Sequence, residues 1–275
     1  MANTKSILII GKPGSAKTTF LAQFVIIARK AKSVVKFWKT PENIQPIEDA
    51  IKKLRTATET ETTHATDNHV INLPITINGN NLELKCPDYG GEQINEMLNI
   101  REINSHWTEL IDNSNSWIVF IRPQKLETIF DLSNKTASEK APEKGESIPS
   151  FKASEQSTVI ELIQMMLSIK KVGYQVPIST PQITIAFTCW DEIEENITPV
   201  SFLENNLPLL NQFLINNWQE SSFKIVGISA QGFRLNTTEN KEKYLDEGPD
   251  KFAFIVQGNS TERIMDLTVL IQEAV

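Results

Sequence analysis

Two kinds of hydrophobic pattern alternate along this chain. Short runs that are apolar throughout, or apolar at every second position, predict strands. They cover residues 6–10, 69–77, 82–86, 116–122, 182–191 (the strand together with its loop) and 224–228, with a shorter candidate at 252–256. Longer segments with apolar residues three and four positions apart predict helices at 17–32, 44–55, 94–110, 158–172, 202–218 and 261–275. The run 116–122 is almost continuously apolar, which is typical of a central parallel strand.

Two polar stretches interrupt this alternation. Residues 56–68 are rich in threonine and nearly devoid of apolar side chains, which predicts a mobile surface loop. Residues 133–156 are rich in Ser, Lys, Glu and Pro, so we expect a flexible insertion there.

The first strand candidate runs directly into a glycine-bearing loop and a helix. The stretch from Gly11 to Thr18 matches the phosphate-binding pattern G-x-x-x-x-G-K-[ST], except that Ala16 stands where a glycine is expected. Amides at a helix start can surround a phosphate when no bulky side chain intervenes. The residues expected to contact phosphate are Gly11, Gly14, Ser15, Ala16, Lys17, Thr18 and Thr19. We expect Lys17 to bridge the β- and γ-phosphates and Thr18 to ligate Mg²⁺.

Ala16 is the one departure within this pattern. A positive φ at this position would strain an alanine by roughly 1–2 kcal/mol. The alternative interpretation of the segment is a Gly/Pro turn ahead of an ordinary helix.

A second motif follows the predicted hairpin 69–86. Asp88 comes at the end of its second strand and Gly91 lies three residues on, which is the D-x-x-G pattern. Such an aspartate holds Mg²⁺ through water, and the glycine amide can bond a γ-phosphate oxygen. Asp88 is therefore a predicted metal-binding residue and Gly91 a predicted nucleotide-binding residue.

The composition of the chain argues against several classes of protein. The chain is 40% hydrophobic and 22% charged with a net charge of −7, which argues against a non-specific nucleic-acid binder. Cys86 and Cys189 cannot make a disulfide framework, and we expect buried thiols in a reducing compartment. No signal peptide or membrane-spanning run is expected, so the chain is predicted to be cytoplasmic.

The order of these motifs resembles that of the Ras-like GTPases of the TRAFAC class. Such proteins place a Mg²⁺-binding threonine in a switch loop just before the hairpin, and Thr66 lies 22 residues before Asp88. Thr58 is the competing candidate because Arg55 precedes it in an Arg-x-x-Thr arrangement, in which the arginine acts as a catalytic finger. A helix-end cation is the other interpretation of Arg55.

The resemblance also implies a water-orienting residue after Gly91. Relatives often have Gln there, whereas this chain has Glu92 followed by Gln93. Either Glu92 orients water differently, or Gln93 substitutes for it, or hydrolysis is slow. Lys17, Glu92 and Gln93 are therefore the predicted catalytic residues.

Guanine recognition is implied at two further places. Ras-like GTPases carry [NT]-K-x-D at the end of a late strand, where Thr188-Cys189-Trp190-Asp191 stands in this chain. The Asp191 carboxylate would accept two hydrogen bonds from guanine, which adenine cannot supply. Cys189 occupies the lysine position, and Trp190 either partly covers the base or packs in the core. Ser229 and Ala230 match the short loop whose backbone meets the guanine oxygen.

Together the motifs are most similar to those of bacterial double-GTPase proteins, which are thought to act with a second GTPase in conflict or defence-type gene clusters. The resemblance implies one α/β domain over residues 1–275, of the three-layer Ras-like P-loop type. Its mostly parallel six-stranded sheet would contain one antiparallel hairpin strand. It also implies a Mg²⁺-dependent guanine-nucleotide switch that binds GTP or GDP and controls a protein partner, with a second GTPase as a candidate. The competing hypotheses are a P-loop ATPase and a degraded-site scaffold subunit.

Overall fold

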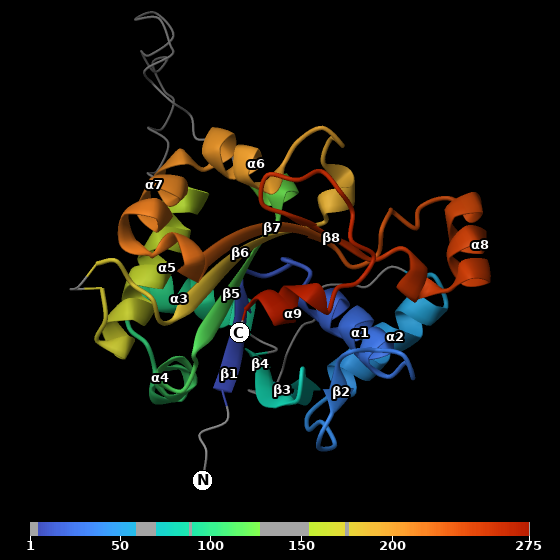
Figure 1. The fold of residues 1–275 in the computed structure, drawn as a ribbon, viewed down its shortest axis with the longest axis horizontal. Coiled ribbons are helices and arrows are strands. Elements are labelled where there is room, and N and C mark those ends of the chain that lie inside the picture. Colours follow the sequence, from blue (N-terminus) through green and yellow to red (C-terminus); the bar gives the residue numbers. More distant parts are fainter. Residues whose placement is uncertain (1–4, 59–69, 88–89, 127–153, 174–175, 275) are drawn as a thin grey trace, which may run out of the picture.

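The computed structural model describes residues 5–58, 70–87, 90–126, 154–173 and 176–274 (Figure 1). In this part of the chain eight strands form one sheet in the order β2-β3-β4-β1-β5-β6-β7-β8. Their bounds are β1 Lys5–Gly11, β2 Lys36–Phe37, β3 Val70–Ile77, β4 Asn80–Pro87, β5 Ser116–Ile121, β6 Gln182–Thr188, β7 Phe223–Ser229 and β8 Phe254–Gln257. The α/β class and the mostly parallel sheet are confirmed.

The expected count of six strands is wrong. β1, β4, β5, β6 and β7 pair in parallel, and β3 joins β4 as the predicted antiparallel hairpin. β2 adds an antiparallel edge to β3, and β8 adds one to β7. β2 has only two residues, which is too short to show any alternation in sequence. β8 overlaps the shorter strand candidate 252–256 and is held by its pairing with β7.

Nine helices cover the two faces of the sheet within the described residues. Their bounds are α1 Lys17–Ala28, α2 Gln45–Arg55, α3 Gly90–Ile100, α4 Ser105–Asp112, α5 Glu155–Lys170, α6 Pro199–Asn206, α7 Pro208–Asn217, α8 Thr238–Glu247 and α9 Val269–Glu273. α1, α2 and α9 pack into one buried apolar cluster, and α3 to α7 pack into a second cluster across the sheet. The three-layer arrangement follows from these two clusters.

β1 shows why one strand serves both clusters. Ile7 and Ile9 belong to the cluster under α1, whereas Leu8 and Ile10 belong to the cluster under α5. Successive side chains of a strand point to opposite faces, so a continuously apolar strand is buried on both sides. All four side chains are at most 2% exposed.

Two predicted helices are each divided in the structure. The segment 94–110 forms α3 and α4, because Arg101 has a φ of 56° and Asn104 caps the second helix by accepting from Trp107 N. The segment 202–218 forms α6 and α7, which meet at Leu207 and Pro208. Proline lacks the amide hydrogen that a continuous helix would need at this position.

The last predicted helix is also shorter than expected. Only α9 is helical, whereas Ile264 pairs with Ile255 of β8 through two backbone hydrogen bonds of 2.8 and 2.9 Å. This pairing takes up the backbone groups that a helix over 261–275 would have used. α8 occupies a segment for which the sequence pattern predicted no helix.

The expected insertion at 133–156 lies almost entirely outside the described residues. Its last three residues are described, and they begin α5, with Ser154 as the N-cap that accepts from Ser157 N at 3.0 Å. No helix in the described part of the chain is both long and apolar enough to span a membrane.

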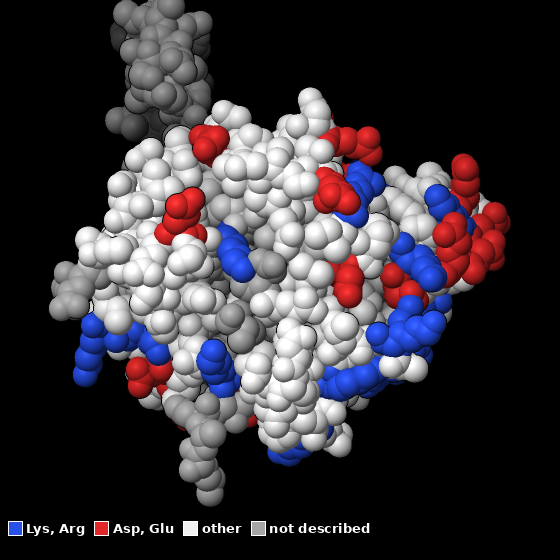
Figure 2. Space-filling model, viewed as in Figure 1, with Lys and Arg blue, Asp and Glu red and all other residues white. Residues whose placement is uncertain are grey.

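Charge is spread unevenly over the surface. Figure 2 shows acidic side chains gathered over α8, and Lys and Arg side chains gathered beside them over α1 and α2. α8 carries four carboxylates and two lysines, with the Tyr244 side chain buried beneath them. Arg29 and Lys30 at the end of α1 pair with Glu48 and Asp250. Arg29 thus links the end of α1 to α2, and Lys30 links it to the 3₁₀ turn Pro249–Lys251 that follows α8.

Candidate functional site

The loops that carry Lys17, Asp191 and Ser229 lie at one edge of the sheet. β1, β5, β6 and β7 are neighbours and parallel, so the loops that follow them lie at the same edge. In open α/β sheets ligands bind outside the carboxyl ends of the strands. The loop after β1 (residues 12–16) is called the phosphate loop below, and the turn after β6 (residues 189–192) the base loop.

The glycines of the phosphate loop are required by close approach and by backbone conformation. A Cβ on Gly11 would lie 2.6 Å from Ser15 Oγ and 2.8 Å from Phe120 O, so no side chain fits there. Gly14 has a φ of 70°, in the left-handed region that favours glycine. A 3.2 Å hydrogen bond from Ser15 N to Lys12 O closes the turn between them.

Ala16 has the positive φ that would strain an alanine at this position. Its φ is 61° and its ψ 23°, and it is the residue immediately before α1. Left-handed backbone at a non-glycine residue costs of order 1–3 kcal/mol and persists only where surrounding structure enforces it. The alanine methyl therefore leaves the loop geometry intact at an energetic cost.

Lys17 is folded over the inside of the phosphate loop. Its Nζ donates to Gly11 O at 2.6 Å, to Lys12 O at 3.2 Å and to Ser15 Oγ at 3.4 Å. The residue is only 8% exposed. Thr18 and Thr19 follow in the first turn of α1, where helix amides and the positive end of the helix dipole favour an anion.

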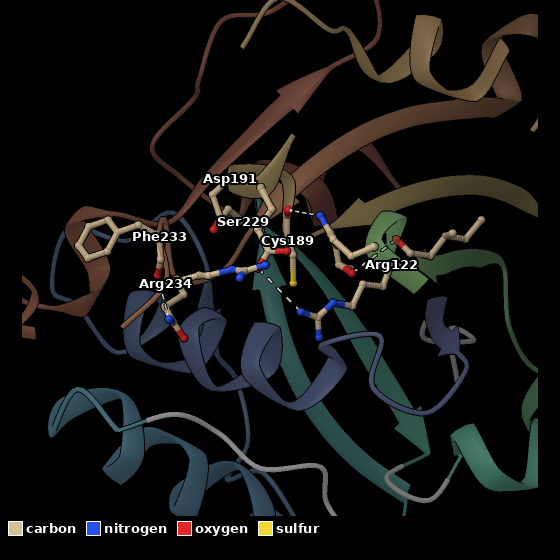
Figure 3. A network of polar contacts seen from close by, with 11 residues as sticks. Arg122, Cys189, Asp191, Ser229, Phe233 and Arg234 are labelled. Atoms are coloured by element: carbon tan, nitrogen blue, oxygen red, sulfur yellow. Dashed lines mark hydrogen bonds and ion pairs between the residues drawn. The ribbon is translucent and has the colours of Figure 1, made fainter. Parts of the chain in front are cut away.

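The base loop and the loop after β7 meet directly (Figure 3). Ser229 Oγ donates to Asp191 Oδ1 at 2.5 Å and accepts from Gly232 N at 2.7 Å. Burial raises the pKa of the Asp191 carboxyl, and the Ser229 hydrogen bond acts against that rise. Sequence positions 191 and 229, predicted separately, are thus brought into one polar contact; Ala230 follows Ser229 in the same loop.

Trp190 packs in the core, which decides between its two interpretations. It is 5% exposed, and its ring lies 5.9 Å from that of Phe187 and 5.6 Å from that of Phe202, between ring centres. Gly227 of β7 provides the space, because a Cβ there would lie 2.3 Å from Trp190 Cδ2. The indole therefore anchors the base loop to the sheet and does not cover a base.

Cys189 begins the base loop with a φ of 52°. Burial raises the pKa of its thiol to about 11, with the Asp191 and Glu192 carboxylates adding to the rise and Arg122 opposing it. The side chain is therefore a neutral thiol at physiological pH.

A charged cluster beside Cys189 was missed by sequence reasoning. Arg234 Nε donates to Glu192 Oε1 at 2.8 Å, and Arg122 Nη2 lies 3.9 Å from the same oxygen (Figure 3). Arg122 directly follows β5, Glu192 lies in the base loop, and Arg234 follows the Ser229 loop. No local motif relates these three positions, and only the strand order brings them together.

Several predicted residues are not brought to the site by the described structure. Thr66 and Asp88 lie outside the described residues. Gly91 and Glu92 are in the first turn of α3, where nothing is described beyond the backbone. Gln93 Oε1 accepts from Trp107 Nε1 at 2.6 Å, a contact that joins α3 to α4.

The two alternatives at the end of α2 are described. Arg55 is in the last turn of α2, as a helix-end cation would be. Thr58 is exposed, and its hydroxyl lies 3.0 Å from that of Thr56.

Comparisons with known proteins give one family. The family model described as Double-GTPase 1 matches residues 8–274. No curated protein sequence matches the chain.

Two solved structures are similar at 12% identity. The small GTPase Arl6 (BBS3) of Trypanosoma brucei with bound GppNp covers 90% of this chain and 99% of its own, with a TM-score of 0.39. A bacterial selenocysteine-specific elongation factor, EF-Sec, covers 89% of this chain and 29% of its own, with a TM-score of 0.36. Likeness at this level says nothing about what this chain binds.

Proposed function

This chain belongs to the Double-GTPase 1 family, and we propose that it is a guanine-nucleotide switch that hydrolyses GTP slowly with Mg²⁺ and controls a protein partner. Membership of a GTPase family supports guanine-nucleotide binding. The proposal adds which residues bind each part of the nucleotide and what changes when GTP is hydrolysed.

The observation that carries the proposal is the contact between Asp191 and Ser229, which lies at the same sheet edge as the phosphate loop and Lys17. A partly buried carboxylate is costly unless donors satisfy it. Ser229 supplies one donor. The guanine N1–H and amino group supply two more, whereas adenine lacks this donor pair.

In this proposal the phosphates of the nucleotide are bound by Lys17 and the backbone amides around it. Its ammonium already lies against the carbonyls of Gly11 and Lys12, where it supplies positive charge inside the loop. We assign Gly14, Ser15, Ala16, Thr18 and Thr19 to the same cradle, by their positions in the loop and the first helical turn.

The chain's oxygen donors suit Mg²⁺, which prefers hard oxygen ligands and keeps several waters. Thr18 lies in the first turn of α1, and Asp88 directly follows β4, the parallel neighbour of β1. These two would hold the ion, with Thr66 as the proposed switch ligand and Thr58 as its alternative. Mg²⁺ would neutralise the charge of the phosphate oxygens.

The proposed switch output is a partner that binds only one nucleotide state. We assign Gly91 to the γ-phosphate and propose that GTP orders residues 56–68 and the segment after Asp88. Glu92 or Gln93 would orient the attacking water. The proposed partner is a second GTPase in a bacterial defence system, acting in the cytoplasm.

Calorimetric titration of nucleotide-free protein with GDP, GTP and ATP in Mg²⁺ tests this function. Guanine-selective binding is expected. Equal or ATP-selective binding would replace it with a P-loop ATPase, and no binding in the unchanged protein would leave a scaffold. Lys17→Ala is expected to abolish triphosphate binding, because the cation inside the loop is lost.

Asp191→Asn tests the base assignment separately. The amide presents one donor and one acceptor, so it should favour xanthosine over guanosine nucleotides, with an expected change in the ratio of the two affinities of at least about tenfold. Competition of xanthosine and guanosine diphosphates for the variant measures this ratio. An unchanged ratio would mean that Asp191 does not meet the base.

A further inference from the structure

The segment after β5 lies between the two loops of the proposed nucleotide site. β5 pairs with β1 on one side and with β6 on the other. Its carboxyl end, residues 122–125, therefore emerges between the phosphate loop and the base loop. Residues 123–125 form a single 3₁₀ turn that begins with Pro123, which is buried.

Lys125 leaves this turn toward the phosphate loop. Its Nζ donates to Pro13 O at 3.2 Å. The same atom would lie only 2.1 Å from a Cβ built on Gly14, so the ammonium rests against the face of Gly14. A second cation is thus placed on the phosphate loop, on a side chain that is exposed.

The residues before Lys125 contact the base loop. Gln124 Nε2 donates to Cys189 O at 3.3 Å, and Arg122 Nη2 lies 3.9 Å from Glu192 Oε1. Lys125 thus contacts the phosphate loop, whereas Gln124 and Arg122 contact the base loop. One short segment therefore touches both loops. Because the turn is short and its start is buried, the position of the Lys125 backbone is tied to that of the base loop.

The surrounding charges distinguish Lys125 from the other cations of the loop. Lys12 pairs with Glu155 at 2.7 Å, which offsets its charge, and Lys17 lies inside the loop. Lys125 forms no ion pair with any residue that the structure describes. An ammonium has three donors, and Pro13 O uses one of them.

We propose that Lys125 is a phosphate-binding residue of the nucleotide site, and that Gln124 and Arg122 fix its position relative to the base loop. This proposal rests on the proposed function, since it adds a residue to the same site. A nucleoside triphosphate or diphosphate supplies anionic oxygens, and a charge-assisted hydrogen bond to an ammonium is stronger than one between neutral groups.

The test compares Lys125→Met and Lys125→Arg with the unchanged protein. Methionine keeps the length of the side chain and removes its charge. The affinities for fluorescent GDP and GTPγS in Mg²⁺ are measured at low and high ionic strength. Lys52→Met is the matched control, because Lys52 is an exposed lysine on α2 whose ion pair within the described residues is with Asp49 of its own helix.

We expect Lys125→Met to weaken binding of both nucleotides by about tenfold at ~0.05 M salt and by less at ~0.5 M, because salt screens an exposed charge. Lys125→Arg should keep most of the affinity, and Lys52→Met all of it. Tripolyphosphate should compete less well for the Lys125→Met site, since it offers phosphate oxygens without a base.

Two results would overturn the proposal. Equal affinities of the unchanged protein and Lys125→Met, at both salt concentrations, would show that Lys125 does not meet phosphate while leaving the proposed function intact. An equal loss in the Met and Arg variants that does not depend on salt would assign Lys125 a purely structural role. No nucleotide binding by the unchanged protein would instead overturn the proposed function, and this proposal with it.

Discussion

Ala16 and Cys189 are both non-glycine residues of the proposed site with a left-handed backbone, and Ala16 stands where the phosphate-binding pattern has glycine. Its φ of 61° is one that glycine adopts without cost. The strain lies directly at the start of α1, between Ser15 and Lys17, so the loop keeps its shape only because β1 and α1 hold both of its ends.

Ala16→Gly should therefore stabilise the nucleotide-free protein. Removing the Cβ relieves about 1–2 kcal/mol of strain, partly offset by the greater freedom of glycine in the unfolded chain. We expect a rise in melting temperature of about 2–4 °C by calorimetry.

Ala31→Gly is the matched control for this change. Ala31 is exposed just beyond α1 and is not among the residues of positive φ. The same exchange should give no rise there. An equal or lower melting temperature for Ala16→Gly would contradict a strained loop.

Cys189 gives a prediction about pH. Because its thiol pKa is about 11, the reactive thiolate fraction should rise roughly tenfold with each pH unit from 7 to about 10. An exposed cysteine would level off above its usual pKa of about 8.5. Alkylation of the native protein in short pulses at increasing pH measures the rate, since Cys86 is buried.

Cys189→Ser should remove this labelling entirely. A rate that levels off near pH 8.5 would mean that the thiol is not held in a buried environment beside Asp191 and Glu192.

Single residues of the site were predictable where a short motif places them on one strand–loop–helix unit. Lys17 follows its loop in the chain, Asp191 lies in the turn after an apolar strand, and Ser229 ends another. Arg122, Lys125 and Arg234 lack such a signal, because their relation to the site depends on which strands become neighbours. Trp190 could not be assigned from sequence, since its burial depends on the space above Gly227.

At the scale of elements, long apolar patterns predicted where helices form better than they predicted whether each helix is unbroken. The helices at 94–110 and 202–218 have the right period but are interrupted, in one case at Arg101 and in the other at Pro208. The proline was visible in the sequence. The break at Arg101 depends on a left-handed residue that the apolar period does not reveal.

The contact between β7 and the base loop gives an element-scale prediction. Gly227→Ala would place a methyl within 2.3 Å of the Trp190 ring, so the turn must move away from the strand. We expect a loss of about 1–3 kcal/mol of unfolding free energy, as for other overpacked sites. Weaker guanine binding should accompany it, because Asp191 follows Trp190.

Urea unfolding and nucleotide titration measure these two effects. The double variant Gly227→Ala, Trp190→Phe should recover part of the lost stability, because the smaller ring leaves room for the methyl. Full stability of Gly227→Ala alone would show that Trp190 does not fill the space above this strand.

At the scale of the whole molecule, one sheet separates two apolar clusters. Each half of the chain contributes to the sheet, and β1 and β5 lie together at its centre. Both clusters are therefore expected to be lost in the same cooperative step.

Leu8→Ala and Ile9→Ala test this cooperativity. Both side chains are fully buried on β1, but they face opposite clusters. Each truncation should cost about 2–5 kcal/mol. Calorimetry should show a single transition, lowered in both variants, and two separate transitions in either variant would mean that the faces unfold independently.

The position of α9 has a consequence for how the protein is made. Leu267, Leu270 and Ile271 are fully buried in the same cluster as Ile7 and Ile9 of β1 (Figure 1). β1 thus obtains part of its cover only from residues that are translated long after it. During synthesis its apolar face is open to aggregation, and this half of the molecule can close only after residue 271 has left the exit tunnel.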